Sequence, residues 1–202
     1  MLESRLQESV GKVAALMPMP SLTKILVIKR VPVYAHWSLL VLSVVILIGA
    51  LERPAETLTA WISFFGVMLL HECGHMIVAQ RRGYYVDSIE LYPIIGIARL
   101  QQPYDRYDAT LIAWGGVAAQ SVVAVPLVLF VSVFGYTRSD AVNLAMGIFG
   151  FYSLFVAAFN LIPVPPLDGA TAWSIVPELF VRARLWFERK KRRRDNPGWR
   201  GR

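Results

Sequence analysis

The sequence predicts an all-α integral membrane protein with about four transmembrane helices. Hydrophobic residues make up 55% of the 202-residue chain, and its mean hydropathy is +0.48. A membrane-spanning helix needs about 20 predominantly apolar residues. Four stretches approach or exceed this length, at residues 35–51, 58–80, 109–134 and 141–162. Such apolar runs exclude a soluble globular fold.

Two segments modify this helical plan. The stretch at 35–51 is short for a span, and we expect it to borrow residues 31–34 or to thin the bilayer locally. Between the second and third stretches, residues 84–100 are rich in β-branched and aromatic side chains and include Pro93 and Gly96. This composition suits a small β hairpin or an edge strand better than a helix.

Basic residues predict the orientation in the membrane. Of the 21 lysines and arginines, only Arg53 and Arg138 fall in the connections on one side of the four stretches. Cytoplasmic loops carry an excess of Lys and Arg, so both termini are expected in the cytoplasm. We therefore expect a multi-pass protein of a bacterial inner membrane, oriented in this way.

The C-terminal part has a different composition. From Ile175 onward, apolar side chains recur at helical spacing, and residues 189–194 are all basic. This pattern predicts an interfacial amphipathic helix followed by a run that is attracted to anionic lipid. We expect no nucleic-acid partner. The chain then divides into a cytoplasmic N-terminal segment (1–30), a transmembrane core (31–175) and a basic amphipathic tail (176–202).

The second stretch carries His71-Glu72-Cys73-Gly74-His75 near its end. Two histidines four residues apart on a helix project from one face, about 6 Å apart along the axis, and can bind one divalent ion. The glutamate between them lies beside the ion and can take a proton from water. Cys73 points away from that face, so we expect it to pack. Because the chain has one cysteine, it forms no intrachain disulfide.

A hydrolytic zinc site needs a third protein ligand and an open position. Asp168 is the strong candidate, because it follows the fourth stretch within residues 160–169, where three prolines forbid a regular helix. Irregular backbone at membrane depth is tolerated where it is buried in protein or lines a wet cavity. This segment and the histidine pair emerge on the same side, so we expect Asp168 to meet His71 and His75.

Together these two motifs resemble the site-2 protease family of intramembrane zinc metalloproteases. Members pair H-E-x-x-H in one span with an N-x-x-P-x-P-P-L-D-G segment in a later one, and both are intact here. Residues 31–37 also resemble the family's entry into its first helix. The resemblance covers about residues 31–175.

The resemblance implies roles for individual residues. His71, His75 and Asp168 would bind zinc. Glu72 would serve as general base and then as general acid. Asn160 would support the site or bind the substrate.

The chain departs from the family at one motif. Members often carry G-P-x-x-N in the helix between the two metal-binding segments, where the asparagine is thought to hold substrate. This chain reads Gly115-Gly116-Val117-Ala118-Ala119-Gln120, without the proline. Gln120 is thus a candidate substrate-binding residue, although its extra methylene changes the reach of the carboxamide by roughly one bond length.

The implied activity is that of a zinc-dependent metalloendopeptidase that hydrolyses peptide bonds within or near transmembrane segments of membrane-tethered substrates. The alternatives are a catalytically inactive membrane metal-binding scaffold and a metal transporter. Transporters typically show repeat symmetry and several intramembrane carboxylates, and neither is visible here. An inactive relative would be expected to lose Glu72 first. The oligomeric state stays open.

Two local interpretations also stay open. The segment at 84–100 could add an unwound substrate as a further strand, or it could merely cover the cytoplasmic face. His36 is either an interfacial anchor beside Trp37 or a histidine that gates water or substrate near the metal.

Overall fold

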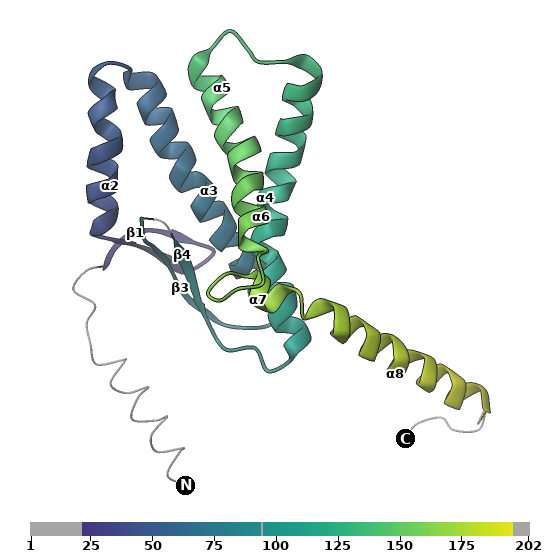
Figure 1. Cartoon of the computed structure of the whole chain (residues 1–202). Coiled ribbons are helices and arrows are strands. Elements are labelled where there is room, and N and C mark those ends of the chain that lie inside the picture. The colour runs from purple at the N-terminus through teal and green to yellow at the C-terminus, as the bar shows by residue number, and fades with distance from the viewer. Residues whose placement is uncertain (1–21, 94, 196–202) are drawn as a thin grey trace.

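The computed structural model describes residues 22–93 and 95–195 (Figure 1). Within these residues, three helical segments are long and apolar enough to cross a membrane. They are α3 (Pro54–Arg81), α4 (Arg106–Phe134) and the continuous run of α5 (Asp140–Gly147), η2 (Ile148–Tyr152) and α6 (Ser153–Asn160). A shorter apolar helix precedes them, formed by α2 (Ser38–Leu47) and η1 (Ile48–Leu51).

Local sequence explains where the long helices begin and end. Helix α3 starts at Pro54, which has the fixed φ suited to a first helical position, and Arg81 lies in its last turn. Helix α4 is capped by Asp105, whose carboxylate accepts a hydrogen bond of 3.0 Å from the backbone amide of Tyr107. It ends at Gly135, whose φ of +77° favours glycine.

The two ends of the helical bundle differ. The connections between α2 and α3 and between α4 and α5 lie at one end, at the top of Figure 1, and the sheet lies at the other. The short helix α7 (Gly169–Ala172) and the start of α8 (Ile175–Asp195) lie at the sheet end too. The histidine motif at the end of α3 and the proline-rich segment after α6 therefore share one end of the bundle.

The sheet has four strands in the order β1-β2-β3-β4. The strands are β1 (Leu22–Ile28), β2 (Val31–His36), β3 (Val86–Leu91) and β4 (Gly96–Leu100). β1 pairs antiparallel with β2, β2 parallel with β3, and β3 antiparallel with β4. β4 is thus an edge strand.

This sheet corrects two expectations. An all-α fold with a single hairpin is incomplete, and residues 31–34 do not extend the first helix, because they belong to β2. These residues form a strand because their burial alternates with a period of two. Val31 and Val33 are buried at 3% and 0% exposure, while Pro32 between them is half-buried. The expected domain boundary after residue 30 separates β1 from β2, and most of the expected N-terminal segment lies outside the described residues.

Helices α3 and α4 make backbone contact where they cross. A Cβ atom added to Gly74 would lie 2.3 Å from the carbonyl oxygen of Gly115, so no larger residue fits without a shift. Small residues allow such close approach in membrane helices. Cys73 beside this crossing packs against the buried apolar core, as expected for a packing residue. The crossing sets the histidine motif directly against α4.

Candidate metal centre

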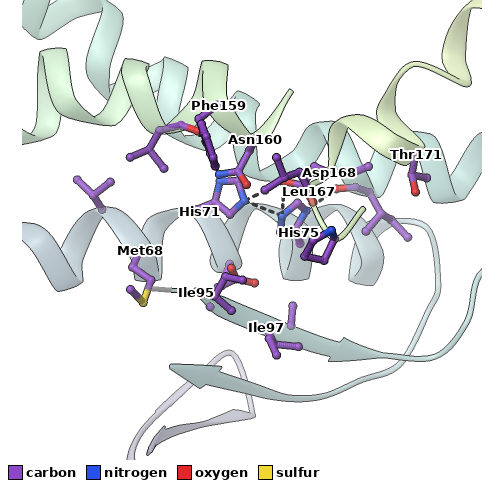
Figure 2. A pocket seen from close by; sticks show the side chains of 18 of the residues that line it. Met68, His71, His75, Ile95, Ile97, Phe159, Asn160, Leu167, Asp168 and Thr171 are labelled. Carbon is purple, nitrogen blue, oxygen red and sulfur yellow. Dashed lines mark hydrogen bonds and ion pairs between the residues drawn. The ribbon is translucent and has the colours of Figure 1, made fainter. Parts of the chain in front are cut away.

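Three ligand atoms meet at the sheet end of the bundle (Figure 2). The Nε2 atoms of His71 and His75 are 3.0 Å apart. Oδ2 of Asp168 lies 2.9 Å from Nε2 of His71 and 3.2 Å from Nε2 of His75. Helix α3 and the proline-rich segment therefore bring together the three side chains that the sequence predicts as ligands.

The other ring nitrogen of each histidine contacts an acceptor on α4. Nδ1 of His75 lies 2.7 Å from the carbonyl oxygen of Ile112, and Nδ1 of His71 lies 2.9 Å from Oε1 of Gln120. Because a carbonyl oxygen can only accept, each Nδ1 carries the hydrogen and donates it. In this tautomer Nε2 is the nitrogen that offers a lone pair, and it is the tautomer that binds metals.

This arrangement fits a bound cation. Two lone pairs and one carboxylate oxygen face one another without a donor between them, and among the described residues Oδ2 of Asp168 has no hydrogen-bond partner. Tetrahedral zinc with bonds of about 2.0–2.2 Å separates its ligand atoms by roughly 3.3 Å. The observed 2.9–3.2 Å is close to that value. A Cβ on Gly116 would lie 2.6 Å from Nε2 of His75, so this glycine keeps the position open.

Two tryptophans hold the segment that carries Asp168. The indole N–H of Trp114 on α4 donates to the carbonyl oxygen of Ala172 at 3.0 Å, and that of Trp173 donates to Leu161 at 2.7 Å. Their rings pack edge to face, 5.8 Å between centroids. Sequence reasoning missed both residues. The available signal was that an indole N–H near a membrane interior needs an acceptor, and the proline-rich segment has carbonyls without helical partners.

Glu72 lies beside the ligands and against the edge strand. It is 5% exposed, and a Cβ on Gly96 would lie 2.5 Å from its Cγ, so β4 touches this side chain. The backbone amide of Ala98 also faces the carboxylate. The sequence did not reveal this contact, because it joins a helix to a strand that follows it.

A cavity of about 850 Å³ opens over the ligands. Its polar lining includes His71, Glu72, His75, Asp168 and Asn160. Its walls are mostly apolar, from α3, from β4 and the residue before it, and from α6: Phe64, Val67, Met68, Ile95, Ile97, Leu100, Phe155 and Phe159. A hydrophobic segment with one polar reacting group fits such a lining.

Gln120 and His36, two residues that the sequence suggested for the site, do not line the cavity. Gln120 is fully buried behind His71 and is absent from the cavity wall, whereas Asn160 lines it. His36 is also absent from the wall. Its Nδ1 lies 2.6 Å from Oγ of Ser38, and its ring packs on Trp37 and Tyr92. This position favours the anchor interpretation of His36.

We predict that the purified protein binds about one zinc ion per chain. Asp168→Ala and His71→Ala should each lower the zinc content well below this value, because two remaining protein ligands hold zinc poorly. Elemental analysis of protein in detergent measures the content. Asp87→Ala, at an exposed acid of β3, is the matched control and should leave it unchanged. Equal zinc in all four proteins would contradict this ligand set.

Known proteins resemble the chain in sequence. No family model matches it. A protein of Synechocystis named as a zinc metalloprotease is 35% identical over 52% of this chain and 27% of its own length. A zinc metalloprotease of Methanocaldococcus jannaschii is 25% identical over 70% of this chain and 41% of its own, and Rip3 of Mycobacterium tuberculosis is 27% identical over 76% and 41%. The chain thus spans less than half the length of these relatives.

A solved structure shares the fold. The site-2 protease of M. jannaschii superposes with a TM-score of 0.64 and 23% identity, over 77% of this chain and 71% of that one. The ligand atoms of the two motifs, in His71, His75 and Asp168, converge in space. The chain therefore has the fold of a solved site-2 protease, resembles zinc metalloproteases in sequence, and carries three apolar helices long enough to cross a membrane.

Proposed function

We propose that the chain is an intramembrane zinc metalloprotease, which hydrolyses peptide bonds within or near transmembrane segments of membrane-tethered substrates. The observation that carries the proposal is the shared cavity. Glu72 and all three ligand side chains open into one largely apolar space at the sheet end of the helices. The names of the relatives support the same activity.

The residues permit a direct mechanism. Zinc held by His71, His75 and Asp168 would supply Lewis acidity for the scissile carbonyl and the attacking water. Glu72 takes the proton of that water and later delivers it to the leaving amine. Because the carboxylate is almost fully buried and lies beside the ligand atoms, it is held at the reacting position. Asn160, on the cavity wall, is proposed to contact the substrate backbone.

The proposal includes a membrane arrangement. We infer four spans, with the helix at residues 38–51 as the first, and both termini in the cytoplasm of a bacterial cell. The positive-inside rule supports this orientation, since Arg53 and Arg138 lie in the two connections at the far end. The sheet and the cavity then face the cytoplasm, from which water enters.

We also propose that the sheet binds the substrate. A helical substrate hides its carbonyls in hydrogen bonds, so it must unwind before attack. β4 is an edge strand and lines the cavity beside Glu72. It can therefore pair with an unwound segment through main-chain hydrogen bonds. In the competing interpretation, β3 and β4 only cover this end of the bundle. The outer edge of β4 then has no role in binding the substrate.

We predict that Glu72→Gln keeps zinc but loses cleavage by about 100-fold or more, because the amide cannot accept the proton of water. Membrane-released fragments are compared between cells that express wild type and Glu72→Gln. Asp87→Asn, an exposed acid, serves as control. Fragments that persist unchanged in Glu72→Gln would refute the base assignment. Zinc binding without fragments in either protein would instead support the inactive scaffold or the transporter.

We predict that Ala98→Pro raises KM several-fold with zinc content unchanged. The Ala98 amide lies at the outer edge of β4 beside Glu72 rather than toward β3, so proline there removes an edge donor and spares the sheet. A change in KM reports lost strand pairing, whereas a disturbed Glu72 would lower kcat. Cleavage is measured on a substrate that the fragment comparison identifies. Arg99→Pro is the companion variant, and it should destabilise the sheet instead. An unchanged KM in Ala98→Pro would favour the covering interpretation.

The C-terminal helix is proposed to lie on an anionic membrane surface. Arg182 on α8 pairs with Asp105 and lies 4.0 Å above the ring of Tyr107, which ties α8 to the start of α4. The Tyr107 backbone amide and Arg182 both hold the pKa of the Asp105 carboxyl below its usual value. Apolar side chains such as Phe180 and Trp186 are exposed along α8.

We predict that replacing Arg189, Lys190, Lys191 and Arg192 by glutamine releases α8 from anionic bilayers. Each charge near such a surface contributes about 1 kcal/mol, and salt screens it. Hydrogen exchange of α8 is measured in nanodiscs with and without phosphatidylglycerol. Arg138→Gln, at the far end of the bundle, is the control. Equal protection of the wild-type helix in both lipids would contradict the proposal.

A further inference from the structure

Gln120 is a buried polar side chain that the mechanism above does not use. It has no exposed surface, lies on α4 and does not line the cavity. Its Oε1 accepts the hydrogen bond from Nδ1 of His71 at 2.9 Å. Among the described residues, its Nε2 has no hydrogen-bond partner. The contact with His71 is therefore the one polar interaction of this side chain in the described part of the protein.

The two ligand histidines differ in how their tautomers are set. His75 donates to the backbone carbonyl of Ile112, which can only accept a hydrogen bond. His71 faces a carboxamide, which has an acceptor end and a donor end. When the carboxamide oxygen faces the ring, Nδ1 of His71 carries the hydrogen and Nε2 keeps its lone pair. If the amide nitrogen faced the ring instead, Nδ1 would have to accept and the hydrogen would move to Nε2, where it blocks metal binding.

We propose that Gln120 is a positioning residue, whose carbonyl oxygen holds the His71 ring in the orientation and tautomer that bind zinc. Metal-bound histidines generally donate their second N–H to an acceptor, and loss of that partner weakens metal binding about 10- to 100-fold. The proposal rests on the zinc site described above. It does not depend on whether that site cleaves peptides.

Packing explains why glutamine suits this position. Helices α3 and α4 touch through Gly74 and Gly115, and Gly116 faces the imidazoles directly. Gln120 lies about one turn further along α4 than Gly116, which corresponds to the rise of four helical residues. Its side chain therefore reaches back toward His71, as helical side chains lean toward the N-terminal end of their helix.

Three substitutions separate positioning from simple packing. Gln120→Met keeps the length and the burial but removes the acceptor, so zinc affinity should fall about 10- to 100-fold. Gln120→Glu keeps the acceptor oxygen and should retain or increase zinc affinity. Gln120→Asn shortens the reach by one methylene and should fall between them. If Gln120 only filled space, Gln120→Met and Gln120→Glu would bind zinc with equal affinity.

The experiment measures zinc affinity by competition with a chelator in detergent, together with NMR of protein labelled with ¹⁵N-histidine. The chain has three histidines, so the spectrum is simple. In zinc-loaded wild type, the Nδ1–H signals of His71 and His75 should both be protected from solvent exchange. Gln120→Met should remove the protection at His71 alone, with His75 as the internal reference.

The controls separate this inference from the zinc site itself. Gln101→Met removes an exposed amide that donates to the hydroxyl of Tyr104, and should change neither affinity nor spectrum. Wild-type affinity in Gln120→Met, or a His71 signal that stays protected, would overturn the role of Gln120 while leaving the zinc site in place. If Gln120→Met fails to fold, the wild-type spectrum tests the role of Gln120 instead. A His71 Nδ1–H that exchanges freely with solvent in zinc-loaded wild type would overturn that role. Wild type that binds no zinc would overturn the site as a whole.

Discussion

The structure depends on one electrostatic constraint, which is that three electron-pair donors of His71, His75 and Asp168 face one another in a largely buried space. Without a cation such an arrangement is unfavourable, because each donor has lost water and gained no hydrogen in return. With a divalent ion all three are satisfied at once. Metal binding and folding of this end of the bundle would therefore be coupled, and the ion would link a helix to a segment that follows two later helices.

The coupling requires backbones to approach closely, and glycines make this possible. Gly74 and Gly115 bring α3 and α4 into contact, Gly116 leaves space beside the imidazoles, and Gly96 allows β4 to reach Glu72. At each position a Cβ atom would clash with the neighbouring element. The chemistry of the site comes from its polar side chains, but their separations depend on residues that have no side chain at all.

The sequence predicted the parts of the site that short-range rules govern. Helical spacing placed His71 and His75 on one face, and the prolines after residue 160 indicated that Asp168 leaves the helix. Tertiary packing governs the parts that were missed. Whether Gln120 reaches the cavity or the back of His71 depends on the rotation of α4, in which one residue corresponds to about 100°. No local pattern supplies that angle.

The sheet was predicted in part for a similar reason. The composition of residues 84–100 indicated strands, and β3 and β4 lie there. The strand at 31–36 was mistaken for the start of a helix because its apolar residues adjoin a longer apolar run. Its alternation of buried and half-buried positions arises only when β3 pairs with it. The sequence could not show this, because the parallel pairing of β2 with β3 joins segments on either side of two helices.

The position of this sheet has a chemical consequence. A peptide bond inside a helix cannot be attacked until its hydrogen bonds are broken, and hydrocarbon offers no replacement partners. At the sheet end, β4 presents backbone groups beside Glu72 and along the cavity wall. Replacement hydrogen bonds are therefore available at the same place as Glu72 and the three candidate ligand atoms. In the mechanism proposed above, unwinding and hydrolysis share one site, and the energetic penalty for extending a substrate is offset where the reaction takes place.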